Sequence, residues 1–455
     1  MESANISHIL TRSFTQSLFP SGYELTPDLN DYYELEIAFY EKQILSDDEL
    51  LKNGGYFLRV NNEYTRHFRM CMGESLKLPA HSSSRLKSFF EKNLFRTGYA
   101  THGLFPYRGK FHPQMIKGLI NIMGLKSGDM ILDPMMGSGT VMVEASLMGI
   151  SSIGIDTSPF CILMTQTKID ALTMSLARVK RALDNYLEVF DYFEKKARGI
   201  GAKKKTSYNH TSNDSPSIME DAAQYITKQT SSGFTKQQKE TVDTYNFLLL
   251  AYLDSVGYSE RSQRKNPVDL FKAILERYIF VAEKIQKVIA GMEKELAVSK
   301  VIEADARNLP LDDSTVDGII FSPPYSFAID YIENDSFHLN YLGADTGSLR
   351  EKMIGLRGKT LLDKFDLYKT DMEKVISECS RVLRKGRICT IIVGTNNNQL
   401  GKVLKKAPDE VPGLHELLIE MASRLGFRLI KMMSRPIMGI SNTMRKEYIL
   451  ILQKN

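Results

Sequence analysis

Residues 130–140 read Met-Ile-Leu-Asp-Pro-Met-Met-Gly-Ser-Gly-Thr and set the architecture expected for the chain. The apolar run 130–132 predicts a short strand, and Gly137 and Gly139 predict a tight turn that opens a helix ending near Gly149. A second apolar run, 152–156, follows this helix and ends, like the first, in an aspartate. A strand, a helix and a strand in this order form a βαβ unit, so we expect a parallel sheet.

Further strands are predicted downstream, after a long interruption. They cover residues 301–305, 316–321, 387–393, 428–432 and 446–453. Helices predicted over 371–383 and 414–425 separate some of them. Only the short polar segment 439–445 joins the last two strands, which predicts an antiparallel hairpin. The sequence therefore predicts an α/β fold with a seven-stranded, mostly parallel sheet and a terminal hairpin.

The regions outside this sheet have a different character. Residues 1–100 show no strong periodicity, and the sequence assigns them no fold. Residues 175–299 predict a helical insertion that contains a solvated linker at 202–217. The α/β domain is expected to comprise residues 101–174 and 300–455, and either of the other two regions could have an accessory role.

Composition limits the classes of protein to which the chain can belong. The 455 residues include 43% hydrophobic side chains and carry a formal net charge of +5, which excludes wholesale disorder and histone-like basicity. The longest apolar runs fall far short of the ~20 residues that cross a bilayer, and no secretory signal is recognisable. Cys71, Cys161, Cys379 and Cys389 form no CxxC pair. We therefore expect a cytoplasmic protein with neither a disulfide framework nor a bound metal.

The glycine turn suits close approach of a ligand to the backbone. No Lys follows Gly139, so the turn is not a P-loop, and Met142 at the third glycine position of a dinucleotide fingerprint weakens a nicotinamide interpretation. Asp156 ends the second strand, where its carboxylate can accept both hydroxyls of a ribose. Asp305 ends the third and can accept from an adenine amine. A nucleoside across these strand ends fits an open α/β sheet, although Asp156 could instead cap the following helix.

Ser322-Pro323-Pro324-Tyr325 follows the most apolar predicted strand. The two prolines fix φ and remove backbone donors, so stiffly held carbonyl acceptors remain beside the Ser322 hydroxyl. Such acceptors suit an exocyclic amine, and Tyr325 offers a flat face for a stacked base. Two hydrogen bonds to the amine would expose its lone pair, so direct methyl transfer would need only positioning and electrostatics. A rigid turn without a function is the alternative.

Three stretches carry a family resemblance. Asp133–Thr140 resembles motif I of S-adenosylmethionine-dependent methyltransferases, and Ser322–Tyr325 resembles motif IV of amino-methylating DNA methyltransferases. Thr101–Gln114 is similar to motif X, which covers the methionine end of the cofactor in that family. A serine in first place of motif IV is typical of the cytosine-N4 group. The resemblance implies a Rossmann-like methyltransferase fold, S-adenosylmethionine as cofactor, and site-specific methylation of cytosine N4 in double-stranded DNA, with a cognate restriction endonuclease as partner.

The resemblance also implies which residues carry the catalytic chemistry: Ser322, Pro323, Pro324 and Tyr325. Ser322 and the Pro323 carbonyl would hold the target amine, and Tyr325 would stack on a base flipped out of the duplex. Adenine-N6 methylation, guanine-N2 methylation of RNA and an inactive nucleic-acid-binding relative remain as alternatives. Cytosine C5 methylation, which needs a thiolate usually found in a Pro-Cys context, is disfavoured because no Cys follows a proline.

The cofactor would lie across the strand ends. The resemblance implies that Asp133, Gly137 and Gly139 hold its methionine end, while Asp156 holds its ribose and Asp305 its adenine. The other residues expected in contact with it are His112, Pro134, Ser138, Thr140 and Ala306.

Five nearby residues have two interpretations each. His112 either contacts the cofactor or caps the helix that follows it. Lys110 and Arg108 either face phosphates or are solvated. Asp330 and Tyr331 either line the pocket or pack behind it.

Overall fold

All seven predicted strands fall within the residues that a computed structural model of the chain describes. The described residues are 18–26, 29, 31–71, 98–107, 109–199, 219, 235–262, 266–292, 296–324, 330–394, 397–408, 410–436 and 446–455. Several predicted features lie outside them, namely the linker at 202–217, Arg108, Tyr325 and the connection at 439–445.

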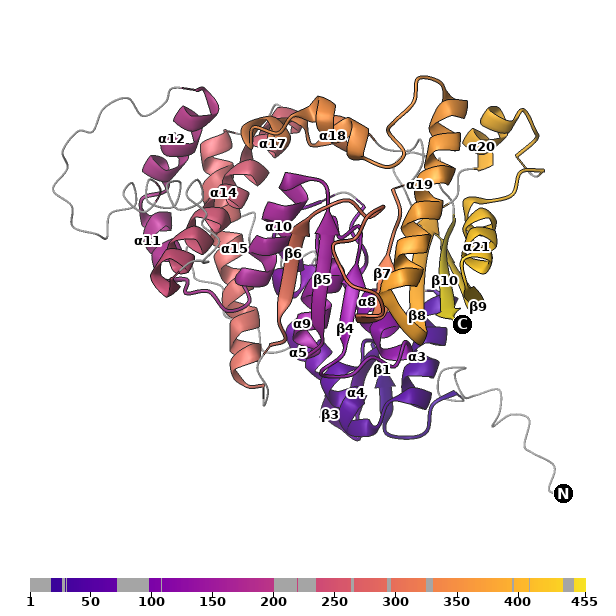
Figure 1. Ribbon diagram of the computed structural model, residues 1–455. Helices are drawn as coiled ribbons and strands as arrows, with labels where there is room; N and C mark the ends of the chain where they lie inside the picture. Colours follow the sequence, from indigo (N-terminus) through magenta and orange to yellow (C-terminus); the bar gives the residue numbers. More distant parts are fainter. Residues whose placement is uncertain are drawn as a thin grey trace.

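A seven-stranded sheet with the order β6-β5-β4-β7-β8-β10-β9 forms the centre of the molecule (Figure 1). Its strands are β4 (Met130–Asp133), β5 (Ser151–Asp156), β6 (Ser299–Glu303), β7 (Val316–Phe321), β8 (Leu383–Gly394), β9 (Phe427–Pro436) and β10 (Lys446–Lys454). Neighbouring strands from β6 to β8 are parallel, and β10 is antiparallel to both β8 and β9. The predicted mostly parallel sheet with a terminal antiparallel hairpin is confirmed.

Several strand boundaries differ from those expected from the sequence, among them the end of β9 at Pro436 and the two that follow. β6 ends at Glu303, so Asp305 lies in the segment after the strand rather than at its end. β8 begins at Leu383 rather than at 387, because the helix α19 (Leu361–Val382) passes directly into it. α19 itself starts well before 371, since the Thr360 hydroxyl accepts a hydrogen bond from the Asp363 N–H and caps the helix there.

Alternate residues of the central strands enter two different cores. Leu132 of β4 and Ile319 of β7 belong to a buried cluster with α19 and α21 (Leu414–Arg424). Their neighbours Ile131 and Ile320 belong to a second cluster, with α8 (Pro113–Ile122) and α9 (Thr140–Leu147). Successive side chains of a strand point to opposite faces, so helices cover both faces of the sheet. The ends of the strands are therefore the place where a ligand can reach the sheet.

The described part of the N-terminal region packs against this sheet domain. Its elements are β1 (Tyr23–Leu25), β2 (Phe57–Val60), β3 (Glu63–Tyr64), α3 (Tyr32–Ile44), α4 (Asp47–Asn53) and α5 (Arg66–Cys71). Ile37, Leu50 and Tyr56 are fully buried in the cluster that contains α8. A Cβ on Gly118 of α8 would lie 2.5 Å from Cγ2 of Ile37, so the glycine lets α3 and α8 approach closely. The described residues between 18 and 71 thus share a hydrophobic core with the sheet.

Helices occupy the long interval between β5 and β6 and stand beside the β6 edge of the sheet (Figure 1). They are α10 (Pro159–Asp170), α11 (Ala177–Asp184), α12 (Tyr186–Ala197), α14 (Lys236–Ser262) and α15 (Pro267–Ala290). Shorter elements elsewhere are η1 (Ala100–Gly103), α16 (Tyr331–Asn334), α17 (Ser336–Tyr341), α18 (Thr346–Lys352) and α20 (Asn397–Leu404). Phe193, Tyr252 and Phe271 are fully buried in the core of the bundle. No helix in the described ranges combines the length and the apolar character needed to cross a bilayer.

A buried carboxylate joins α3 to α8 and to the segment that leads into β2. Oε1 of Glu41 accepts hydrogen bonds from the Gly55 N–H (2.8 Å) and from Nδ2 of Asn121 (2.6 Å). Its Oε2 accepts from the Tyr56 N–H (3.3 Å). Burial raises the pKa of Glu41 to about 7, although these three donors and Lys117 oppose the shift. The carboxyl group therefore titrates near neutral pH in the folded protein.

Glu41→Gln is expected to change the pH dependence of stability. A carboxyl group whose pKa rises from 4.5 to about 7 on folding stabilises the fold fully below pH 4.5, and this contribution is lost as the pH rises through 7. The free energy of unfolding of the wild type should therefore fall by about 2–3 kcal/mol relative to that of Glu41→Gln between pH 5 and 8. Urea unfolding at both pH values measures this, with the exposed Glu420→Gln as control. A difference that does not vary with pH would contradict the assignment.

Candidate active site

A pocket with about 950 Å³ of empty space, part of it open to solvent, lies at the carboxyl ends of four neighbouring strands. The strand ends contribute Pro134–Ser138 after β4, Asp156 and Thr157 at β5, Ala304–Ala306 after β6, and Ser322–Pro324 after β7. The other lining residues are Tyr107, Gly109–Phe111, Cys161, Tyr331, Lys352–Ile354 and Leu356. Because β4 pairs directly with β7, the glycine turn and the Ser-Pro-Pro turn border the same pocket.

The structure brings together nine of the predicted site residues at this pocket: Pro134, Gly137, Ser138, Asp156, Asp305, Ala306, Ser322, Pro323 and Pro324. His112, Asp133, Gly139 and Thr140 are not among its lining residues. Asp133 and Thr140 are 0% and 2% exposed and lie behind the glycine turn. Tyr325 is outside the described residues, so its predicted stacking role stays a prediction.

Neighbouring elements hold the glycine turn in shape. Gly137 and Gly139 have φ angles of +47° and +73°, which glycine adopts at little cost. The Gly137 N–H donates to Oδ2 of Asp156 (2.9 Å), and the Thr165 hydroxyl of α10 donates to the Gly137 carbonyl (3.1 Å). The Lys168 ammonium, also on α10, donates to the carbonyl between the two glycines (3.0 Å). The end of β5 and one face of α10 therefore fix the turn that borders the pocket.

Alanine substitutions at the two glycines should have unequal effects. Both place a Cβ on a left-handed backbone, which costs about 1–2 kcal/mol. A Cβ on Gly139 would also lie 2.5 Å from Cγ2 of Thr165, whereas one on Gly137 would meet Cε1 of Tyr107 at 3.7 Å. Gly139→Ala is therefore expected to lower the free energy of unfolding by about 2–3 kcal/mol, and Gly137→Ala by about 1 kcal/mol. Chemical denaturation compares them, and equal losses would mean that Thr165 does not restrict the turn.

The aspartates that end β4 and β5 differ in their access to the pocket. Oδ1 of Asp133 accepts from the Met135 N–H (3.1 Å), and its Oδ2 has no hydrogen-bond partner among the described residues. The oxygens of Asp156 accept from the N–H groups of Gly137 and Ser158 (2.9 Å each). Burial raises the pKa of both carboxyl groups. Ser158, rather than Asp156, is the N-cap of α10, so the contact with the Ser158 N–H stabilises the turn before the helix and does not cap it. A carboxylate with about four acceptor sites can also receive ribose hydroxyls.

Asp305 is tied to an arginine that sequence inspection did not single out. Its oxygens accept from the Arg307 N–H (2.9 Å), Nε (3.0 Å) and Nη2 (2.7 Å). Burial alone would raise the pKa of Asp305, but Arg307 brings it below the usual value. Arg307 also pairs with Asp371 (3.0 Å) and donates to the Lys352 carbonyl in the pocket wall (3.0 Å). An adenine amine would therefore compete with Arg307 for the Asp305 carboxylate.

The Ser-Pro-Pro turn is held rigidly at the pocket. All residues of β7 are buried, so the strand that delivers the turn is packed on both faces. Pro323 is buried, whereas Ser322 and Pro324 are half-buried and remain within reach of a ligand. Since proline has no N–H, the turn presents carbonyl oxygens and one hydroxyl to the pocket.

The segment after η1 forms another wall of the pocket. Lys110 lies in this wall, where it donates to the His102 carbonyl (3.2 Å), and burial lowers its pKa to about 8. Lys110 is therefore not a solvated side chain. His112 occupies the N-cap position of α8, as the capping interpretation expects, although its side chain makes no capping hydrogen bond, and it is not among the residues that line the pocket. Burial lowers the pKa of His112 to about 4, and it is neutral at pH 7.

Two further lining residues have chemistry that bears on the reaction. The Cys161 thiol lies 3.6 Å from the Tyr107 hydroxyl, and burial raises its pKa, so it is not the thiolate that C5 methylation requires. Tyr331 lines the pocket, but its neighbour Asp330 does not: it accepts from the Glu333 N–H (3.1 Å) and pairs with Arg350 (2.7 Å). In the described ranges, no three His, Cys, Asp or Glu side chains gather in a way that could hold a metal ion.

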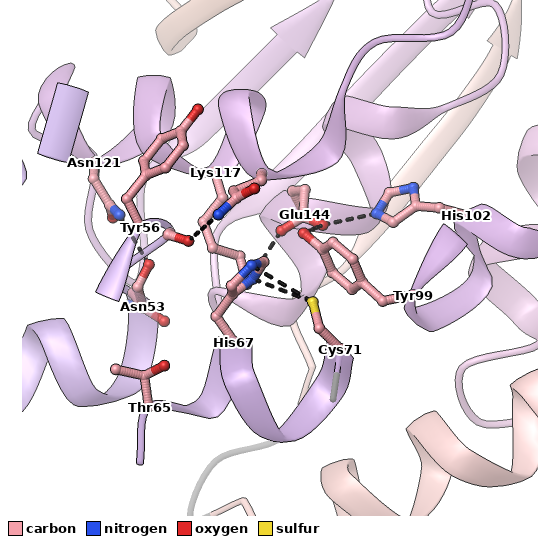
Figure 2. Close-up of polar contacts among 12 residues, drawn as sticks. Asn53, Tyr56, Thr65, His67, Cys71, Tyr99, His102, Lys117, Asn121 and Glu144 are labelled. Carbon is pink, nitrogen blue, oxygen red and sulfur yellow. Dashed lines mark hydrogen bonds and ion pairs between the residues drawn. The ribbon is translucent and has the colours of Figure 1, made fainter. Parts of the chain in front are cut away.

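A buried polar cluster anchors η1 and the pocket wall that follows it (Figure 2). Oε1 of Glu144 on α9 accepts from the Tyr99 hydroxyl (2.5 Å) and from Nε2 of His102 (2.7 Å), while its Oε2 lies 3.4 Å from Nζ of Lys117. Burial alone would raise the pKa of Glu144, but Lys117 and His102 bring it to about 2. Burial lowers the pKa of His102 to about 4. At pH 7 the cluster therefore holds a Glu144–Lys117 ion pair and a neutral His102, whose carbonyl receives Lys110.

The sheet order and the pocket define the class of this domain. β4, β5 and β6 extend the sheet in one direction and β7 starts the other, so the pocket lies at the switch point of a Rossmann-like methyltransferase fold. Residues 104–221 match the family model described as "RMKL-like, methyltransferase domain". This match and the fold are those of an S-adenosylmethionine-dependent methyltransferase domain.

Particular relatives are found among DNA- and RNA-modifying enzymes. The chain is 26% identical to the Type II methyltransferase M.BsoBI of Geobacillus stearothermophilus over 287 residues, which are 55% of this chain and 54% of the relative. It is 40% identical to the Type II methyltransferase M.MjaII of Methanocaldococcus jannaschii over 94 residues, 21% of this chain and 17% of the relative. A tRNA (guanine(10)-N2)-dimethyltransferase of Methanothermobacter thermautotrophicus is 42% identical over 52 residues, 11% of this chain and 16% of the relative. The chain thus spans about half or less of the length of these relatives.

The residues at the pocket fit S-adenosylmethionine. The backbone at Gly137 is open to a ligand, because apart from the chain neighbours of Gly137, Tyr107 is the only residue within 4 Å of the position that a Cβ on Gly137 would occupy among the described residues. Asp156 has acceptor capacity for ribose hydroxyls, and Lys110 supplies a buried cation that matches the carboxylate of the methionine part. When bound there, the cofactor supplies an electrophilic methyl group.

Proposed function

We propose that this protein transfers a methyl group from S-adenosylmethionine to the exocyclic N4 amine of cytosine in double-stranded DNA. The observation that carries the proposal is the placement of the glycine turn, Asp156 and the Ser322–Pro324 turn around one pocket. One side of that pocket suits the cofactor, and the other is lined by Ser322, Pro323 and Pro324, whose hydroxyl and carbonyl oxygens can accept hydrogen bonds. Donor and acceptor of the methyl group can therefore meet without an intermediate covalent step.

The acceptors of the Ser-Pro-Pro turn would orient the amine. The Ser322 hydroxyl oxygen and the Pro323 carbonyl each accept one N–H of the amine, which directs the nitrogen lone pair away from the turn and toward the methyl group. The nitrogen forms a bond to the methyl carbon as the carbon–sulfur bond breaks, and the surplus N–H proton leaves to water. Cys161 remains a neutral thiol and takes no part in bond formation.

Two arguments favour cytosine N4 and DNA within this chemistry. Serine in the first place of the turn resembles the cytosine-N4 group, and Type II DNA methyltransferases are among the relatives. A base in a duplex must be flipped out to reach such a pocket, and Tyr325 is the residue proposed to stack on it. A cognate restriction endonuclease would be the functional partner. Adenine N6 is the alternative amine on the same substrate.

An RNA guanine amine is the second candidate substrate, because the tRNA guanine-N2 relative matches a short stretch of this chain. Both reactions need the same cofactor and an acceptor-rich turn. They differ in the nucleic acid that reaches the pocket.

Single-molecule sequencing of DNA from cells that express the chain tests the proposal directly. N4-methylcytosine at a short recurrent sequence, absent from cells that express a Ser322→Ala variant, is the expected result. N6-methyladenine at such a sequence would correct the base but not the reaction. Unmodified DNA together with new N2-methylguanine in RNA would replace the proposal by the RNA alternative.

A further inference from the structure

Tyr107 lies between the two parts of the pocket that are proposed to hold the ends of the cofactor. Its ring atom Cε1 is 3.7 Å from the position that a Cβ on Gly137 would occupy. Its hydroxyl is fixed 3.6 Å from Sγ of Cys161. Asp156 at the end of β5 lines the same pocket as this ring. The ring thus lies beside the glycine turn in the pocket that the end of β5 also borders.

The covalent structure of S-adenosylmethionine determines which atom falls beside this ring. Its sulfur joins the ribose to the methionine part, so a ribose at Asp156 and a methionine part at Gly137 leave the sulfur between these two residues. Tyr107 lies beside Gly137 and lines the same pocket as Asp156. The sulfur carries a positive charge before methyl transfer and none afterwards.

We propose that the ring of Tyr107 binds the positively charged sulfur of S-adenosylmethionine through a cation–π interaction and so favours the cofactor over its demethylated product. Aromatic rings attract ligand cations whose centres lie within about 6 Å of the ring centroid, most strongly in desolvated sites. The inference rests on the proposed cofactor position but not on the identity of the nucleic acid.

The carboxylates near the pocket are engaged elsewhere, which leaves this role to the ring. Asp133 does not line the pocket, and Arg307 occupies Asp305 at the adenine end. Asp156 receives two backbone N–H groups and is assigned to the ribose. Burial raises the pKa of Tyr107 well above its usual value, so the phenol is neutral and attracts a cation through its ring.

Binding measurements with two ligands that differ by the charged methyl group test the proposal. The dissociation constants of S-adenosylmethionine and S-adenosylhomocysteine are measured by calorimetry for the wild type, Tyr107→Phe and Tyr107→Leu, without nucleic acid. Tyr107→Phe keeps the ring and should keep the wild-type preference for S-adenosylmethionine. Tyr107→Leu removes the ring and should reduce the preference for S-adenosylmethionine by about 3- to 30-fold.

A ratio of two affinities separates this role from a structural one. Partial unfolding lowers the affinity for both ligands alike, so it leaves the ratio unchanged. Tyr192→Leu, which removes a ring from α12 whose hydroxyl donates to the Met219 carbonyl, is the matched control and should leave the ratio unchanged too. An unchanged ratio in Tyr107→Leu would overturn the proposal. The result does not depend on which nucleic acid is methylated. The proposed role of Tyr107 can therefore be wrong while the proposed reaction is right, and the proposed reaction can be wrong while the role of Tyr107 is right.

Discussion

Ser322→Ala is expected to slow methyl transfer about 10²- to 10³-fold while it leaves the affinity for S-adenosylmethionine nearly unchanged. Removal of the hydroxyl takes away one of the two acceptors proposed to orient the amine. The cofactor would contact the other side of the pocket, at the glycine turn and Asp156. Single-turnover transfer of a labelled methyl group to unmethylated plasmid DNA measures the rate, and calorimetry measures cofactor affinity.

Ser322→Asn provides the conservative comparison, because its side-chain carbonyl keeps an acceptor near the position of the hydroxyl. It should retain more of the methyl-transfer rate than Ser322→Ala. Thr157→Ala, on the β5 side of the pocket, removes a hydroxyl that has no role in holding the amine. If Ser322→Ala lost rate and cofactor affinity to the same extent, the assignment of Ser322 to the amine would be wrong.

Glu144→Gln should lower the free energy of unfolding by about 3–5 kcal/mol, because it leaves a buried cation without its anion. Glu144 and Lys117 are 0% and 1% exposed. The Gln side-chain oxygen can still accept from Tyr99 and His102, so the loss reports chiefly the charge of Glu144. Urea unfolding at pH 7 measures it, with Glu420→Gln as the exposed control.

The double variant Glu144→Gln/Lys117→Met distinguishes an ion pair from a packing effect. When both charges are removed, neither side chain buries an unpaired charge, so stability should recover relative to Glu144→Gln alone. Strictly additive losses from the two substitutions would contradict the ion-pair interpretation.

Most of the sheet could be predicted because its signals are local. Apolar runs such as 130–132 and 316–321 are short, are bounded by turn residues and give buried strands in the structure. The boundary at Asp305 was wrong because β6 ends where its pairing with β5 ends, at Asp156 and Glu303. The end of β6 depends on where the neighbouring strand β5 stops, and the sequence around Asp305 does not contain that information.

The pocket residues likewise divide into those that a local sequence pattern predicted and those that it did not. Pro134 and Gly137 were predicted because proline restricts the backbone and glycine frees it wherever they occur, and Ser322 was predicted because two prolines follow it. Cys161, Lys352–Ile354 and Leu356 of the pocket lining were missed, as was Arg307, which holds Asp305, since none of them stands in a distinctive pattern. Tyr107 was within the stretch that resembles motif X, but nothing in the sequence set it apart from its neighbours.

The sequence by itself determined the chain order of the seven strands of the large sheet and the two turns that border the pocket, because each follows from the conformational limits of a few adjacent residues. Only the tertiary structure decided which charges are buried and paired. Glu144 meets Tyr99 and His102 across more than 40 positions of the chain, and Glu41 meets Asn121 across 80. The environment of a side chain, and with it the pKa and the capacity to bind a ligand, depends on groups that only folding brings within a few ångströms.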